Sequence, residues 1–334
     1  MDLSVIWFVL VAVLFIGFFF LEGFDYGVGV LLPFLGRSDS ERRLIIGSIG
    51  PVWDGNEVWM ITAGGALFAA FPHVYATLFS GFYLALFLML VALIVRGVGL
   101  DFRSKQPGPN WRSTWDWLIF AGSLVPALLW GVAVTNLIKG VPIDDKMNYV
   151  GTFFDLLSPY TLVGGAAFLL VFVYHGAVYL TLKLEDALAQ RARRAALVIG
   201  CFTAAACLVL VGMTYMYTDL FASIGAGISL WAAVGAFVLS YLAMRVGRTG
   251  WAFVASGLAI VLTTVAFFWG LFPRLMVSSL NPAWSLTVAN ASSSPLTLKL
   301  MTIAAGLLVP VVLAYQAWTY WTFRKRVTLR DLEY

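Results

Sequence analysis

Charged residues are scarce in this chain of 334 residues: Asp, Glu, Lys and Arg make up 11% of it, and hydrophobic residues make up 61%. Water-soluble domains carry about 25% charged residues, so this composition excludes an ordinary soluble domain. A run of about 20 mostly apolar residues is long enough to cross the hydrocarbon core of a bilayer. The composition therefore predicts a protein that spans a membrane several times.

Cysteine and histidine are nearly absent as well, with two residues of each. Cys201 and Cys207 lie six residues apart in one hydrophobic stretch, and this spacing indicates neither a disulfide nor a zinc site. A bound haem needs an axial ligand such as His in a prepared pocket. His73 follows Pro72 at the edge of a stretch, which leaves His175 as the internal candidate for a haem ligand. We favour a hydrogen-bonded histidine between helices, and we expect no metal site in this chain.

A removable signal peptide and a soluble domain are also missing from the sequence. The N-terminus has no positively charged region and no small-residue cleavage site, so the first hydrophobic run is expected to stay as a helix. The longest connections, 139–159 and 273–295, are too short to form an independent core. Residues 1–334 are therefore expected to form a single polytopic membrane domain.

Nine hydrophobic stretches are long enough to cross the bilayer as α-helices. They are 3–34, 44–71, 75–100, 115–137, 161–182, 195–217, 224–244, 251–271 and 298–323. The predicted fold is therefore an all-α integral membrane protein with nine transmembrane helices. Eight of the stretches could pair as two bundles of four helices.

The basic residues predict the orientation of these helices, because cytoplasmic loops carry an excess of Lys and Arg. Of the 21 basic residues, 17 belong to the connections after the first, third, fifth and seventh stretches or to the C-terminal tail. These 17 are Arg37, Arg42, Arg43, Arg96, Arg103, Lys105, Arg112, Lys183, Arg191, Arg193, Arg194, Arg245, Arg248, Arg324, Lys325, Arg326 and Arg330. The N-terminus is thus predicted to lie outside and the C-terminus in the cytoplasm. The net charge of +4 follows this loop pattern, so no nucleic-acid partner is indicated.

Four acidic residues interrupt stretches that are otherwise hydrophobic: Glu22 and Asp25 in LEGFDYGVG, and Asp54 and Glu57 in PVWDGNEVW. Acids at membrane depth are costly and mark routes for protons or ions. Counting from the predicted inner helix ends places Asp25 and Asp54 about 13 and 15 Å deep at 1.5 Å per residue. Residues three apart share a helix face, so each pair is expected to act together.

These positions predict a proton pathway, with a structural role as the alternative for any single acid. Such an acid could pair with an arginine from a partner chain, or Glu22 could form a hydrogen bond across a helix interface. Because four acids lie at related depth, we favour a functional role for at least Asp54 or Asp25.

Glycines and one acid near these stretches are interpreted as packing and interface residues. Gly23 and Gly27 form a small-xxx-small face, and Gly64 and Gly65 follow in the second stretch, where small residues let helices approach closely. Asp116 lies among tryptophans in STWDWL, which is typical of a membrane-interface belt with a carboxylate at a helix start.

Several motifs occur in a fixed order along the chain: GFDYGVG, WDGNEVWMITAGGALFAAFP, GVGLDFRSK, WDW, WSLTVANASSSPLTLKLMT and AYQAWTYW. From residue 7 to residue 323 the chain resembles the smaller subunit, or subunit II, of cytochrome bd quinol oxidase. The resemblance implies a respiratory terminal oxidase of the cell membrane that oxidises a quinol and reduces dioxygen to water. It also implies nine helices, arranged as two four-helix bundles plus one peripheral helix.

The same resemblance implies how cofactors and partners are distributed. The complex is expected to carry two b-type haems and one d-type haem on a larger partner subunit, so that the smaller subunit is haem-free. Small accessory subunits could also belong to the complex, and membrane lipid and the quinol substrate surround it. The smaller subunit is expected to supply a proton route from the cytoplasm toward the haems.

Particular residues carry the resemblance to the family's acidic motifs. Asp54, with its neighbour Trp53, matches the family's WDG motif, and Asp25 matches the acid of its GFD motif. Glu57 stands where some relatives carry Gln, which weakens its case as an obligatory proton carrier. The resemblance therefore ranks Asp54 first, Asp25 second and Glu57 third.

A basic and an acidic residue at the inner end of the third stretch, Arg96 and Asp101, match a pair of opposite charges in the family. A secondary transporter with an intramembrane acidic cation site is the alternative function. Transporter sites lie near the membrane midplane on broken helices, whereas these acids are predicted nearer the inner surface. That displacement favours the oxidase subunit.

Overall fold

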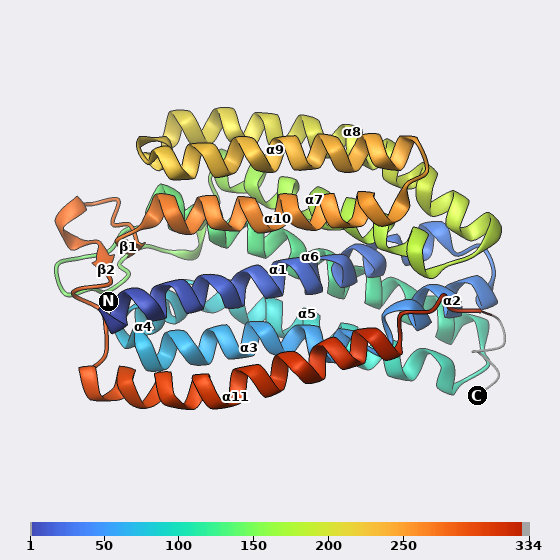
Figure 1. The fold of residues 1–334 in the computed structure, drawn as a ribbon, viewed down its shortest axis with the longest axis horizontal. Helices are drawn as coiled ribbons and strands as arrows, with labels where there is room; N and C mark the ends of the chain where they lie inside the picture. The colour runs from blue at the N-terminus through green and yellow to red at the C-terminus, as the bar shows by residue number, and fades with distance from the viewer. Residues whose placement is uncertain (1, 329–334) are drawn as a thin grey trace.

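The computed structural model describes residues 2–328, and its long elements are all α-helices (Figure 1). They are α1 (Leu3–Leu35), α2 (Asp39–Ile49), α3 (Trp53–Ala70), α4 (Pro72–Gly81), α5 (Tyr83–Phe102), α6 (Pro109–Lys139), α7 (Pro159–Lys183), α8 (Asp186–Tyr217), α9 (Ile224–Arg245), α10 (Thr249–Leu271) and α11 (Pro295–Thr322). Two short strands, β1 (Arg274–Met276) and β2 (Leu286–Thr287), pair antiparallel. Single 3-10 turns occupy Arg103–Lys105, Phe153–Leu156, Leu220–Ala222 and Pro282–Trp284. Arg330, one of the basic residues counted above, lies outside the described residues.

Eight of the described helices are long and apolar enough to cross a membrane, namely α1, α5, α6, α7, α8, α9, α10 and α11. Helices α4, α6, α7 and α11 begin with proline, which is favoured in the first turn because its missing N–H would be unpaired there anyway. The predicted all-α membrane architecture is confirmed at this level.

Two of the predicted stretches, 44–71 and 75–100, are not continuous helices, which corrects the expectation from the sequence. The first is divided between α2 and α3, because Pro51 has no N–H to donate and the chain turns there. The second is divided between α4 and α5 at Phe82. At 1.5 Å per residue α4 is about 15 Å long, which is too short to cross a bilayer alone.

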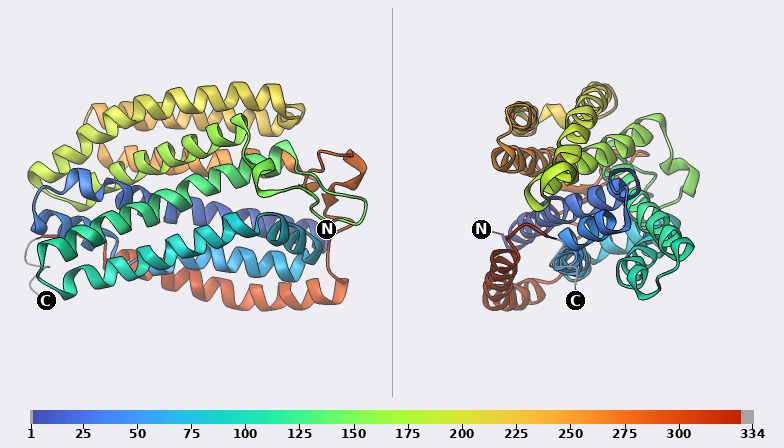
Figure 2. Two further views of the ribbon diagram at one scale, coloured as in Figure 1. Left: turned by 180° about the vertical axis from the view of Figure 1, so that it is seen from behind. Right: turned by 90° about the vertical axis from the view of Figure 1, so that its right-hand side faces the viewer.

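Helix α1 is the central element, because it packs against α3, α6, α7 and α10 (Figures 1 and 2). Helices α7 and α8 form a close pair, as do α9 and α10, and α6 lies between α5 and α7. Helix α11 lies at the periphery beside α1 and α3, on the opposite side of the molecule from α8 and α9 (Figure 2). Leu298 is its one fully buried residue within the described chain.

A tryptophan of α1 holds the beginning of the peripheral helix in place. The indole N–H of Trp7 donates to the backbone oxygen of Leu298 (3.2 Å) and to the hydroxyl of Thr302 (3.1 Å). The nearby connections from α6 to α7 and from α10 to α11 meet at the same end of the molecule, through the β-bridge between Val141 and Ser278. This end, where the N-terminus also lies, is closed by ordered connections (Figure 1).

The opposite end is held by an ionic network around Asp116, which is fully buried. Asp116 accepts from Arg103 Nε (2.5 Å) and Arg42 Nη1 (2.6 Å), which joins α6 to the end of α5 and to α2. Asp39 pairs with Arg103 (3.0 Å) and Arg112 (2.7 Å) beside it. Asp116 is thus a buried ion-pair partner of Arg42 and Arg103 beyond the first turn of α6, and the expected carboxylate at a helix start is not found there.

Glycines allow α1 to approach α7, as predicted for Gly23 and Gly27. A Cβ atom on Gly27 would lie 2.0 Å from the backbone oxygen of Phe172, and one on Gly23 would lie 2.7 Å from its ring. Gly64 and Gly65 have no atom of the described residues within 4 Å of a Cβ position, so the close packing expected of them is not found. Close helix approach is thus found at α1 and α7, and also between α6 and α7, where a Cβ atom on Gly131 would lie 2.3 Å from the backbone oxygen of Gly164.

We expect Gly27→Ala to destabilise the protein, because the new methyl group would meet backbone atoms that cannot turn aside. Overpacking of a close helix contact costs about 1–3 kcal/mol, which should lower the thermal unfolding midpoint of the purified protein. Gly212→Ala, in α8, is the matched control because nothing lies within 4 Å of its Cβ position. Equal midpoints for the two variants would show that the approach of α1 to α7 is not constrained at Gly27.

Candidate functional site

A buried cluster of charged side chains joins three helices in the interior. Arg96 of α5 donates to Glu22 of α1 and, at 2.9 Å, to Glu57 of α3. The side chains of Arg96 and Glu22 are fully buried, whereas that of Glu57 is 17% exposed. Asp25 is also fully buried, one helical turn after Glu22. The arginine thus comes from the same chain, not from a partner chain, and it pairs with two of the four predicted acids.

Aromatic packing fixes the arginine in this position. The guanidinium carbon of Arg96 lies 4.9 Å from the centre of the Tyr26 ring, within the range of a cation–π contact. Its Nε and Nη2 atoms are buried and have no hydrogen-bond partner among the described residues. Arg96 therefore retains donor capacity beyond its two carboxylate partners.

The cluster contains more carboxylates than cations. Counting Glu22, Asp25 and Glu57 against Arg96 gives three potential negative charges and one positive charge, a sum of −2 when all are ionised. Uncompensated charge in a protein interior is strongly unfavourable. The group can therefore exist in more than one protonation state, which is what the transfer of protons requires.

Asp25 is connected to the peripheral helix through Asn56, a residue that the sequence analysis did not identify. The Asn56 amide donates to Asp25 Oδ2 at 2.6 Å, and its oxygen accepts from Tyr320 (2.8 Å) and Gln316 (3.3 Å) of α11. Asn56 is fully buried. The available signal was a polar residue between Asp54 and Glu57 in an otherwise hydrophobic stretch.

Asp54 does not belong to the buried cluster. It lies exposed in the first turn of α3, a position where the helix dipole favours a carboxylate, and Glu57 lies one turn further along. The neighbouring Trp53 packs its ring near Gly97 of α5, beside the arginine. Among the four predicted acids, the structure therefore brings together Glu22, Asp25 and Glu57 and leaves Asp54 at the surface.

Asp101 and Arg96 do not form the expected pair. Asp101 is exposed and forms no ion pair with any of the described residues, whereas Arg96 is directed toward α1 and α3. Five residues at 3.6 residues per turn place the two side chains on well-separated faces of α5. Asp101 is therefore not part of this site.

His175 is enclosed by hydrogen bonds and aromatic rings. One ring nitrogen is 2.7 Å from the hydroxyl of Ser256 and the other is 3.2 Å from the backbone oxygen of Phe20. The imidazole is fully buried and stacks on Phe253, with the ring centres 4.8 Å apart. Because both nitrogens are engaged, His175 does not fit the role of an axial haem ligand.

Comparisons with known proteins give consistent results. The family model described as "Cytochrome bd terminal oxidase subunit II" matches residues 3–323. The chain is 45% identical over 329 residues to "Cytochrome bd ubiquinol oxidase subunit 2" of Bacillus subtilis (strain 168), covering 98% of this chain and 97% of the relative. It is 42% identical over 367 residues to "Cytochrome bd-I ubiquinol oxidase subunit 2" of Escherichia coli (strain K12), covering 99% and 97%. Among solved structures, the bd oxidase from Geobacillus thermodenitrificans shares the fold, with a TM-score of 0.79, 19% identity, and coverage of 97% of this chain and 100% of the other.

We expect Arg96→Gln to reduce the amount of folded protein sharply, because buried carboxylates would lose their cation. Breaking a buried ion pair from one side costs about 3–5 kcal/mol. The yield and the thermal unfolding midpoint of the purified protein measure this loss.

The matched test removes charge from both sides, as Arg96→Gln with Glu22→Gln and Glu57→Gln. This triple variant should recover much of the lost stability, because neutral amides can form hydrogen bonds with one another. A triple variant no more stable than Arg96→Gln alone would contradict the assignment of Arg96 as the counter-charge.

Proposed function

The chain belongs to the cytochrome bd terminal oxidase subunit II family, and from this premise we propose that its buried acids supply protons to the oxidase. The complex is a respiratory terminal oxidase of the cell membrane, an oxidoreductase that couples quinol oxidation to the reduction of dioxygen to water. One observation carries the proposal: three carboxylates surround a single arginine, and one of them, Glu57, reaches the surface of the chain.

The proposed route begins at the exposed carboxylate of Asp54 and continues one turn along α3 to Glu57. From Glu57 the proton passes to Glu22, while Arg96 stays protonated and holds the two carboxylates together. Asp25, fully buried like Glu22, lies one helical turn further along α1. The order from exposed to partly exposed to buried supports this direction. General acid–base groups of this kind must lie within hydrogen-bond reach of one another, directly or through one water.

We assign the haems to a larger partner subunit: two of b type and one of d type. The geometry of His175 supports this assignment, since neither of its nitrogens is free to bind iron. His73, the other histidine, is exposed at the beginning of α4. The larger subunit would associate with this chain in the membrane, and small accessory subunits could join them.

We further propose nine membrane crossings. Helices α2 and α3 together form the second crossing, and α4 and α5 form the third. The first group of four crossings contains α1, α3, α5 and α6, the second contains α7 to α10, and α11 is peripheral. The packing of α1 on α3 and α6, of α7 on α8 and of α9 on α10 supports this grouping. The sequence places 17 of its 21 basic residues in alternate connections and the C-terminal tail, so that side is assigned to the cytoplasm and the N-terminus to the outside.

A secondary transporter was the alternative, and the breaks between α2 and α3 and between α4 and α5 are of the kind that such proteins use. Family membership outweighs this similarity, because the match extends over residues 3–323.

We expect Asp25→Asn to slow dioxygen reduction by about tenfold or more, because loss of one general acid–base group has effects of this size or larger. Assembly and haem content of the complex should stay intact, since Asn preserves the shape of the side chain. Asp54→Asn should slow turnover as well. Asp101→Asn is the matched control, because this exposed acid lies outside the cluster. Normal turnover in an intact Asp25→Asn or Asp54→Asn complex would remove that residue from the essential route.

The assigned orientation predicts the side from which protons are taken. In vesicles whose lumen faces the C-terminal end of this chain, turnover should alkalinise the lumen and acidify the medium. Entrapped and external pH indicators, together with a dye for membrane potential, measure this. Both pH changes on one side, or no potential, would contradict the assigned intake side.

A further inference from the structure

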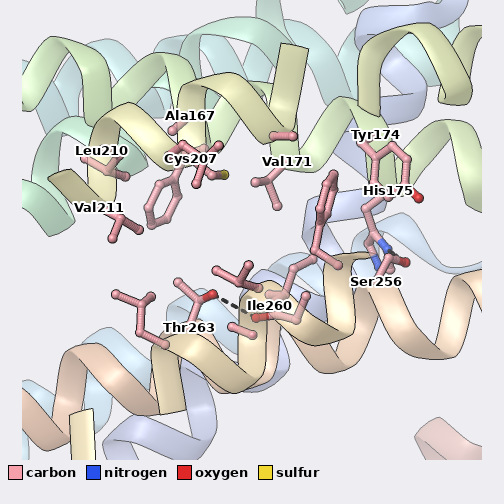
Figure 3. Close-up of a pocket in the computed structure, with 18 of the residues that line it drawn as sticks. Ala167, Val171, Tyr174, His175, Cys207, Leu210, Val211, Ser256, Ile260 and Thr263 are labelled. Carbon is pink, nitrogen blue, oxygen red and sulfur yellow. Dashed lines mark hydrogen bonds between the residues drawn. The ribbon is translucent and has the colours of Figure 1, made fainter. Parts of the chain in front are cut away.

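A cavity of about 450 Å³ lies between the helix pairs α7–α8 and α9–α10. Figure 3 shows apolar side chains of α7 and α8, among them Val171 and Val211, facing Ile260 of α10 across this space, and His175 with Ser256 at one end. The cavity extends along α9 from Leu230 to Leu242, about 18 Å at 1.5 Å per residue. This length is similar to the thickness of one leaflet, which is half of the roughly 30 Å hydrocarbon core of a bilayer.

Four arginines gather at one end of these helices, around the turn between α9 and α10. Arg193 of α8 reaches across to this turn and donates to the backbone oxygens of Met244 (3.0 Å) and Arg245 (2.7 Å). Arg245 and Arg248 flank the turn itself, and Arg194 follows Arg193 in the sequence. Together Arg193, Arg194, Arg245 and Arg248 are named the basic turn.

The basic turn has no compensating acid. Arg194, Arg245 and Arg248 are exposed, and none of the four arginines forms an ion pair with a described residue. Arg191, which is close in sequence, differs because Glu41 binds it. Arg193 is engaged by the backbone of the turn, whereas the exposed guanidinium groups of Arg194, Arg245 and Arg248 are available to bind an anion from outside the chain.

Helix geometry connects the basic turn to the cavity. Arg245 follows Tyr241, a cavity-lining residue, by four residues and thus lies on the same face one turn further along α9. Arg193 precedes Gly200, also a lining residue, by seven residues, which is two turns or about 10 Å on the same face of α8. On both α8 and α9, the arginines therefore lie on the same helix face as the residues that line the apolar cavity, one or two turns away.

We propose that this region is a binding site for an acidic phospholipid, with the phosphate at the basic turn and one acyl chain in the cavity. Arginine binds phosphate oxygens through two parallel hydrogen bonds, which suits the headgroup. The cavity has a volume within the range of about 300–1,000 Å³ typical of ligand sites, and its lining is mostly apolar. A free inorganic phosphate would use the arginines alone and leave the cavity without a role.

The test uses the purified oxidase complex, freed of lipid in detergent and mixed with phosphatidylcholine vesicles or with vesicles that also contain phosphatidylglycerol. Native mass spectrometry should show that the complex retains phosphatidylglycerol in preference to phosphatidylcholine. In the double variant Arg245→Gln with Arg248→Gln, this preference should fall about thirtyfold. Each arginine near a lipid surface contributes about 1 kcal/mol to binding of an anionic lipid, and two are removed. Added inorganic phosphate should not displace the lipid.

Two further variants separate this site from general surface charge. Arg324→Gln with Lys325→Gln removes two exposed charges elsewhere in the chain and should leave the preference unchanged. Ala204→Leu, which narrows the cavity without touching the basic turn, should reduce retention of the lipid. The proposal would be overturned if the two double variants reduced the lipid preference equally. It would also be overturned if Ala204→Leu reduced lipid retention while Arg245→Gln with Arg248→Gln left it unchanged. The second result would show that an uncharged chain occupies the space. Dioxygen reduction is not a readout, so the outcome is independent of the proton route.

Discussion

The pairing of Arg96 with Glu22 and Glu57 is the interaction on which the arrangement of α1, α3 and α5 depends. A guanidinium with no exposed surface is costly in a membrane protein, and here two carboxylates compensate it. The aromatic ring of Tyr26 and the close approach of glycine-bearing helices hold the three groups in contact. The same interaction therefore locates three helices and creates the site.

The same side chains of the cluster therefore serve both the packing of the helices and the proposed function. With three carboxylates and one arginine, the ion pair needed for packing leaves negative charge in excess, and that excess is the property a proton route uses. Asn56 extends the network to α11, a helix with little other buried surface. The peripheral helix is thus tied to the buried acid Asp25 by two hydrogen bonds in series.

The half of the molecule formed by α7 to α10 has a different character. Its buried polar contacts are between uncharged side chains and backbone, such as Tyr174 with Ser240 (2.9 Å) and His175 with Ser256 (2.7 Å). Its charge lies at the helix ends, in the basic turn. The half built on α1, α3, α5 and α6 is organised by buried charge, whereas this half combines an apolar cavity with exposed arginines. The proposed tasks of the two halves, proton supply and lipid binding, follow from this difference.

The sequence by itself determined the membrane class, most helix positions and the existence of a set of intramembrane acids, because hydrophobicity, proline and the alternation of basic loops are local properties of the chain. It also placed the family through motifs spread from end to end. It did not determine the break at Pro51 within a stretch whose composition read as continuous, nor that Asp54 would be exposed while Glu22 was enclosed. Those outcomes depend on which helix faces meet. The partners of Arg96 lie 74 and 39 residues away, and its neighbour in the sequence, Asp101, points elsewhere. Only the tertiary structure decides such pairings, since side chains distant in sequence become neighbours through the packing of whole helices.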